Sequence, residues 1–130
     1  MDLESTIAER ELTDVESGKP VRIRVERPQQ VADDEWCCRF SVEGAEHGSL
    51  DRAYGIDSLQ AFVLALEGIR LAVEGRRDQL SWLGGPSGEL GLSRRVPDFL
   101  GLKFERGLNE LIDCEMAALT RELKEKTDSA

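Results

Sequence analysis

Side chains able to do covalent chemistry are few and scattered in this sequence. His47 is the only histidine, and nothing in the sequence around it supports a Ser-His-Asp or Cys-His device. The cysteines, Cys37, Cys38 and Cys114, are odd in number and have no C-x-x-C spacing, which favours reduced thiols over a zinc or redox site. We therefore predict no catalytic residue, no metal site and no cofactor.

Two polar stretches have the composition of ligand loops without their spacing. "ADDE", residues 32–35, lacks the alternating carboxylates and the central glycine of a calcium loop, and favours a solvated hairpin turn. "GGPSGELG", residues 84–91, has the glycines of a phosphate loop but no Lys-Ser/Thr after them and no strand–loop–helix context. We expect a flexible surface loop there.

The stretch "YGIDSLQAFVLALEGI", residues 54–69, joins a turn, a polar tripeptide and a long apolar run. Asp57 is a good helix N-cap, and Gln60 is placed to reach back to the amide of Asp57, close to a capping box. These residues therefore predict the start of a helix. Contact of Asp57 or Gln60 with a ligand is the alternative.

Arginines gather on one predicted sheet face. Strict alternation in "VRIRVER" and "WCCRFSVEG" places Arg22, Arg24 and Arg39 on the outward face. Either they form a cross-strand ion-pair ladder with nearby glutamates, or they make a platform for an anionic group. The same alternation predicts Cys38 in the core and Cys37 on the polar face. Trp82, beside two glycines, is either a core-edge residue or an interface anchor.

In the predicted order of elements that position these side chains, most strands come first and the helices follow. We predict strands near residues 7–13, 21–27, 36–44 and, shorter, 50–54, with a loop at 28–35. A helix is expected from 57 to 74, and either another strand or an extended segment at 79–85. Strands followed by helices imply an α+β fold: an antiparallel sheet of about four or five strands packed on a central helix and a long C-terminal helix. Residues 1–130 are expected to form one domain, with 1–5 and 125–130 loose.

The two helices are predicted to pack on one another. The first is apolar nearly all round, so we expect the sheet to cover its large side chains, such as Leu59 and Leu66, and the second helix to cover the small ones near Gly68. The second helix begins between 101 and 104 and runs to about 124. Part of its apolar stripe is expected to overhang the domain, so that Leu119 and Leu123 meet a second copy in a homodimer. The alternative is that the end of the helix folds over the Gly-rich loop and covers Trp82.

Charge and hydropathy narrow the classes of partner. With 17 Lys and Arg against 26 Asp and Glu, the net charge is −9, which disfavours nucleic acid and anionic membranes and favours a basic protein surface. The N-terminus has no signal-peptide pattern, and the longest apolar run, residues 61–66, is far too short for a membrane span. A cytoplasmic protein is expected.

The order of "IAERELT", "WCCRFSVEG", "AYGIDSLQAFVLALEGI", "LSWLGG" and "GELGLSRRVPDFLG" resembles a family of small uncharacterised bacterial α+β domains of unknown function. The resemblance covers most of the chain, and its most distinctive part is 54–65. It implies a bacterial source and a compact α+β domain, and it carries over no catalytic residue.

Three functions stay open at this point. The first is a non-catalytic protein-binding module, a regulatory or toxin-neutralising partner. The second is a small-ligand binder or minor enzyme that uses the arginine face of the sheet or the Gly-rich loop. The third is a structural homodimer. The candidate interaction residues are Arg22, Arg24, Arg39, Trp82, Leu119 and Leu123.

Overall fold

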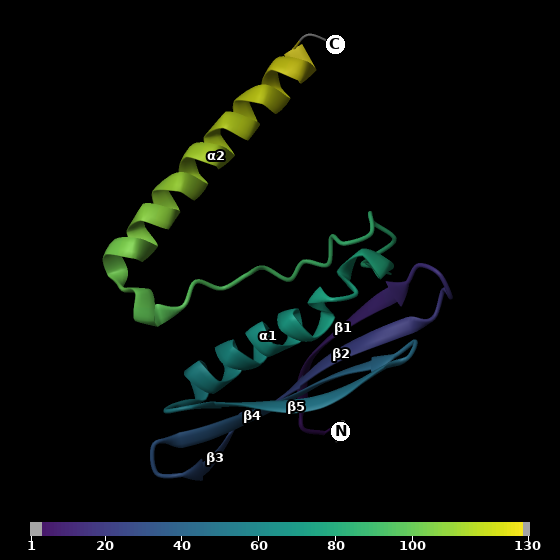
Figure 1. The fold of residues 1–130 in the computed structure, drawn as a ribbon, viewed down its shortest axis with the longest axis vertical. Coiled ribbons are helices and arrows are strands. Elements are labelled where there is room, and N and C mark those ends of the chain that lie inside the picture. Colours follow the sequence, from purple (N-terminus) through teal and green to yellow (C-terminus); the bar gives the residue numbers. More distant parts are fainter. Residues whose placement is uncertain (1–3, 129–130) are drawn as a thin grey trace. The chain divides into compact units, whose positions relative to one another are not determined.

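A computed structural model describes residues 4–128 of the chain (Figure 1). The chain divides into an N-terminal unit, Met1–Arg94, and a C-terminal unit, Arg95–Ala130. The N-terminal unit holds an open antiparallel sheet and one helix, and the C-terminal unit holds one long helix, so the predicted α+β class is confirmed. One domain over residues 1–130 stays a prediction.

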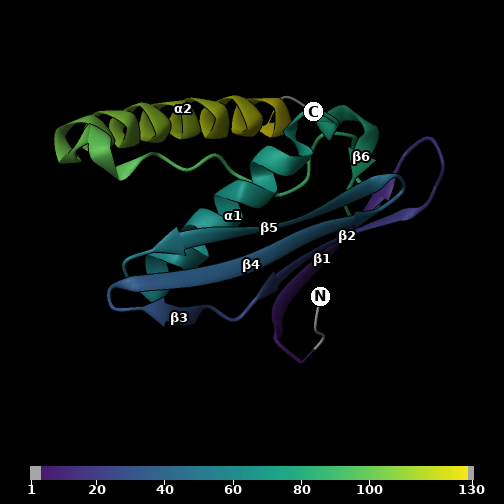
Figure 2. The same ribbon diagram turned by 60° about the horizontal axis from the view of Figure 1, so that its bottom comes forward.

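The sheet is built from β1 (Thr6–Asp14), β2 (Pro20–Glu26), β3 (Gln29–Ala32), β4 (Glu35–Gly44), β5 (His47–Gly55) and the short β6 (Leu80–Ser81). β4 is paired along both edges: β5 pairs with one edge of β4, and β2 and β3 pair with the other edge (Figure 2). β1 joins β2 to β6, and every pairing is antiparallel. The predicted short strand at 50–54 is therefore a full strand, and part of the expected loop before β4 is β3.

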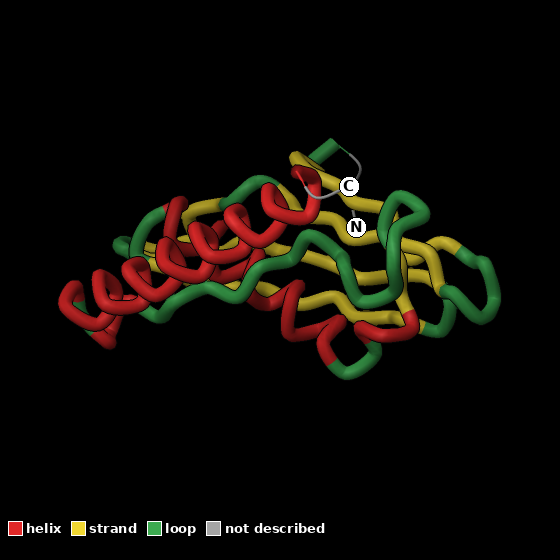
Figure 3. Tube along the Cα trace, turned by 90° about the horizontal axis from the view of Figure 1, so that it is seen from above, coloured by secondary structure: helices red, strands yellow, loops and turns green. Residues whose placement is uncertain are grey.

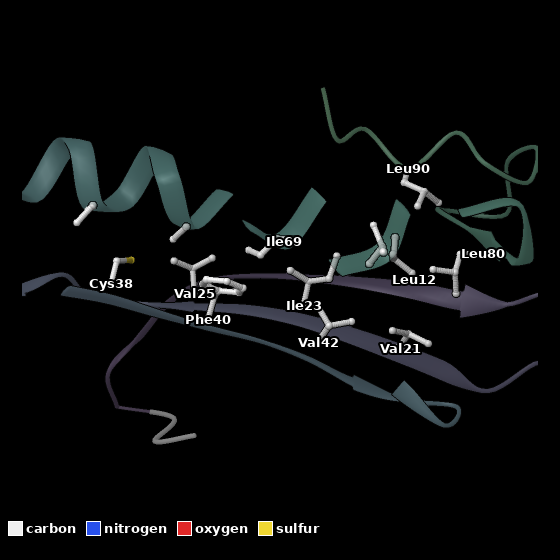
Figure 4. Packing of buried hydrophobic residues seen from close by; sticks show 13 residues of the cluster. Leu12, Val21, Ile23, Val25, Cys38, Phe40, Val42, Ile69, Leu80 and Leu90 are labelled. Carbon is white, nitrogen blue, oxygen red and sulfur yellow. The ribbon is translucent and has the colours of Figure 1, made fainter. Parts of the chain in front are cut away.

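The strands that were predicted from alternation bury the residues on their inward face. Val21, Ile23 and Val25 of β2 and Phe40 and Val42 of β4 are buried in one cluster under the helix (Figure 4). Period-two burial of this kind is what one covered sheet face requires. The inward faces of these two strands were therefore predicted correctly.

Helix α1 (Ser58–Glu74) begins where the sequence predicts. The Asp57 carboxylate accepts a hydrogen bond from the Gln60 amide at 2.8 Å, so Asp57 is the N-cap. The Gln60 side-chain oxygen accepts from the Ile56 amide at 2.8 Å, one residue before the expected position. Both polar side chains thus bond to the backbone of the helix entry, and the capping function is confirmed.

The buried face of α1 is only partly the predicted one. Ile69 and Val73 are buried as expected, but the other two buried residues are Ala61 and Ala65, while Leu59 and Leu66 are exposed by 69% and 43%. The helix is therefore turned so that part of its small-residue side faces the sheet. Close approach explains the preference: a Cβ on Gly68 would lie 2.5 Å from the Phe40 ring. Large side chains on that face would hold the helix too far from β4 and β5, the strands on which it lies.

The prediction of an outward, exposed Cys37 is half wrong. Its position opposite Tyr54 confirms the outward face, yet Cys37 is 7% exposed and Ser41, on the same face, is fully buried. Each is a small side chain set between larger ones on adjacent strands; Ser41 lies between Arg24 and Leu50. Neighbours of that size cover a short side chain on an open sheet face.

The C-terminal unit contains a short 3-10 turn, Asp98–Leu100, and helix α2 (Leu102–Asp128), which is a single unbroken helix (Figure 3). The helix begins within the predicted range but continues four residues past the expected end at Lys124, so residues 125–128 are helical rather than loose. A second 3-10 turn, Arg77–Gln79, follows α1 in the N-terminal unit.

Candidate interaction surfaces

The outer face of the sheet carries the predicted ion-pair ladder. Arg24 Nε lies 3.1 Å from the Glu9 carboxylate, and Arg22 Nε lies 3.8 Å from Glu11 and 4.0 Å from Glu9. The registers β1–β2 and β2–β4 set these charges side by side, with Arg22 between Glu11 and Glu43. Two of the candidate arginines are therefore occupied by carboxylates of their own sheet.

The ladder continues to Arg39 and ends at Arg52. Arg39 Nε lies 3.6 Å from the carboxylate of Glu26, whose side chain is only 8% exposed. On the other side of Arg39, the β4–β5 register places Arg52 directly opposite. Like charges directly across a sheet are unfavourable, and the alternation of charge fails between Arg39 and Arg52.

Trp82 is held at the edge of the core rather than presented as a free anchor. The Arg10 guanidinium lies 3.9 Å from the centre of the Trp82 ring, a cation–π contact, and donates hydrogen bonds of 3.0 Å to the carbonyls of Leu90 and Gly91. Trp82 is half-buried against the core cluster. Its role as a core-edge residue is the one that its contacts support.

The same contacts correct the expectation of a flexible glycine-rich loop. Leu90 is 1% exposed and belongs to the core, and Arg77 Nε donates to the Gly88 carbonyl at 2.7 Å. A side chain on Gly91 would lie 2.6 Å from the Trp82 ring, and Gly91 has φ = +69°, so glycine is required there. The loop at residues 84–91 is therefore held by contacts of its last residues, and Leu90 packs into the core beside β1.

A shallow polar cavity of about 410 Å³ lies beside the β1–β2 and β4–β5 turns. Its lining residues are Asp14, Glu16, Ser17, Lys19, Ala45, Glu46 and Arg76. Asp14 Oδ1 accepts hydrogen bonds from the Glu16 amide and from the amide and hydroxyl of Ser17, and the Ser17 amide bond above all holds the pKa of Asp14 below its ordinary value. Asp14 thus shapes the turn, and none of the candidate arginines lines this cavity.

Residues 4–128 contain no group of three or more His, Cys, Asp or Glu side chains placed to hold a metal ion. His47 opens β5, and its side chain lies outside the described residues. In the same part of the chain, neither helix has the length and apolar character needed to cross a bilayer.

Helix α2 presents the candidate residues Leu119 and Leu123. They belong to an apolar row with helical spacing, which we call the α2 stripe: Leu108, Leu111, Ile112, Met116, Leu119 and Leu123. Leu119 and Leu123 are 56% and 55% exposed, and no described residue of α2 is buried. In the described part of the C-terminal unit, residues 95–128, there is no strand and no second α-helix to cover this stripe.

Sequence reasoning missed the roles of Arg10 and Arg52. The alternation "LDRAYG", with Leu50, Arg52 and Tyr54 on one face, was a usable signal for Arg52. The sequence holds no comparable signal for Arg10, because its partners, Leu90 and Gly91, lie 80 and 81 residues away along the chain.

The comparisons with known proteins bear on the N-terminal unit. A family model described as "Domain of unknown function (DUF6968)" matches residues 8–94, which lie within that unit. Neither the curated proteins nor the solved structures gave a match. Helix α2 lies outside the matched residues.

Proposed function

We propose that this chain, which belongs to the DUF6968 family of domains of unknown function, is a non-catalytic protein-binding module whose main contact element is α2. One observation carries the proposal: a helix of 27 residues bears a continuous apolar stripe, and residues 95–128 of its own unit contain no other α-helix and no strand to bury that stripe against. Exposed apolar surface of this extent is characteristic of an interface.

The occupant we propose for the α2 stripe is α2 of a second copy. At 1.5 Å per residue the helix spans about 40 Å, enough for an extended helix-to-helix contact. Residues 102–115 carry four acids and two bases, net −2, while residues 116–128 carry three of each, net 0. An antiparallel pair therefore sets the acidic half of one helix beside the neutral half of the other, whereas a parallel pair sets acid beside acid.

The proposal also includes a location and a kind of partner. We place the protein in the bacterial cytoplasm, as a regulatory or toxin-neutralising partner of another protein. A net charge of −9 attracts basic protein surfaces, which supports a basic partner. The small-ligand alternative has weaker support, since Arg22, Arg24 and Arg39 lie beside glutamates rather than around a cavity.

Light scattering at micromolar concentration tests the homodimer. We expect twice the chain mass for the wild type and the mass of a monomer for Leu119→Glu, because a carboxylate in the stripe would be desolvated in the dimer. Ala117→Glu is the matched control: position 117 lies roughly 200° round the helix from 119, so this variant should stay dimeric. A monomeric wild type, or a dimer that Leu119→Glu leaves intact, would refute the proposal.

A further inference from the structure

The second surface with unmet interactions is the free edge of β5, in the N-terminal unit. Among the described residues β5 pairs only with β4, so its other edge presents unpaired backbone amides and carbonyls. Residues 48–52 and 54 are all exposed. No proline interrupts the strand, and such an edge is a template for the addition of another strand.

The side chains beside this edge define what would fit. Leu50, Arg52 and Tyr54 lie on the outer face of the sheet, because their partners on β4 are Ser41, Arg39 and Cys37. Leu50 and Tyr54 are about half exposed, at 54% and 48%. The edge therefore offers a row that is apolar, cationic and apolar.

Arg52 is the charge that its own sheet does not balance. Its neighbour across the β4–β5 ladder is Arg39, and the nearby carboxylate of Glu26 pairs with Arg39. Within residues 4–128 the guanidinium of Arg52 has no ion pair. An acidic side chain on a strand added beside β5 would complete the rung as Glu26, Arg39, Arg52 and a new carboxylate.

We propose that the β5 edge binds an extended segment of a partner protein, with an acidic residue opposite Arg52 and apolar residues opposite Leu50 and Tyr54. The added strand pairs with the β5 backbone, and its alternate side chains supply the specificity. The proposal goes beyond the α2 contact, because it concerns another surface and another kind of partner.

A second copy of this chain does not supply that acid. If two β5 edges pair antiparallel, the outer faces of the two sheets lie on the same side of the joined sheet. Residues directly opposite one another across the new pair then belong to the same face. Arg52 would then meet Gly48, Leu50, Arg52 or Tyr54 of the other copy. The only acid of β5, Asp51, lies on the opposite face with Phe40.

A pair of synthetic peptides tests the proposal on the full chain. In the first peptide, threonine residues alternate with a valine, a glutamate and a second valine, in that order. A lysine at each end keeps the negative net charge of the protein from repelling the peptide. The second has lysine in place of the glutamate. Fluorescence anisotropy should show the glutamate peptide binding about fivefold tighter than the lysine peptide.

Substitution of Arg52 should redirect this preference. Arg52→Glu is expected to favour the lysine peptide, and Arg52→Gln to abolish the difference. Arg121→Glu, which makes the same change of net charge on α2, is the matched control and should keep the wild-type preference. Because Arg52 faces Arg39, neither substitution at 52 should lower the melting temperature.

Hydrogen exchange gives a second readout. Binding as an added strand should slow exchange of β5 amides when the glutamate peptide is present. No binding of that peptide at millimolar concentration, a preference that Arg52→Glu leaves unchanged, or binding without protection of β5 would each overturn the proposal. These outcomes do not depend on whether α2 forms a dimer, which Leu119→Glu tests separately.

Discussion

Burial of single residues in this sheet depends on what stands beside them on the next strand. Cys38 lies under α1, and burial, followed by the nearby Cys37 and Glu26, raises the pKa of its thiol from 9.0 to about 11. Cys37 points to the other face and is nevertheless 7% exposed, between Tyr54 and Gln29. Cys114, in contrast, is exposed on α2.

Thiol labelling should therefore show one fast cysteine. At pH 8 we expect Cys114 to react first, since the thiolate is the reactive form and a buried thiol is both shielded and protonated. Cys37 should follow slowly, and Cys38 should react only with unfolding. Raising the pH toward 9 should still leave Cys38 unlabelled, because its pKa is about 11. Mass spectrometry after proteolysis assigns the sites, and early labelling of Cys38 would contradict the register of β4.

The predictions for single residues that the structure confirms rest on local sequence signals. The Asp57 cap needs only Gln60, three residues away, and the arginine ladder needs only strand alternation and acids on the same face. Arg52 was missed because its environment depends on β5 pairing in register with β4 through Arg39. Pairing of that kind follows from the turn between two strands and is not written in either strand alone.

At the scale of elements, the buried face of α1 was only partly predicted, for a physical reason. Hydrophobicity correctly placed Ile69 and Val73 toward the sheet, but it also placed Leu59 and Leu66 there, and both are exposed. Phe40 of β4 lies so close to Gly68 that a Cβ there would be 2.5 Å from its ring, and the small side chains of Ala61 and Ala65 are buried on the same helix. Size complementarity between layers is a pairwise property that a single sequence window does not reveal.

Gly68→Ala tests this contact. Alanine normally stabilises a helix interior by about 0.5–1 kcal/mol relative to glycine. Here the added methyl group would lie 2.5 Å from Phe40, and we expect a net loss of about 1–2 kcal/mol in the free energy of unfolding. Gly75→Ala is the control, since nothing lies within 4 Å of its Cβ position and φ is −65°. Urea denaturation that shows equal effects at both sites would contradict the packing of α1.

At the scale of the molecule, the core is contained in the N-terminal unit. The buried cluster and the side chains packed against it extend from Leu12 to Leu92, and none comes from α2. The family match ends at residue 94, where this unit also ends. The N-terminal unit thus has the core of an independent domain, and the proposed α2 contact is a property of the remaining chain.

A fragment of residues 1–94 should therefore fold alone. We expect cooperative thermal unfolding, with the near-ultraviolet signal of Trp82 on Arg10 retained, because the fragment loses no core residue. It should also be a monomer at concentrations at which the full chain dimerises, since the α2 stripe is gone. A fragment of residues 1–79 is the informative control: it lacks Leu80 and Leu90, which are 0% and 1% exposed, and should not unfold cooperatively. If 1–94 also lacks a cooperative transition, the core requires the C-terminal unit and the division at Arg94 does not mark an independent domain.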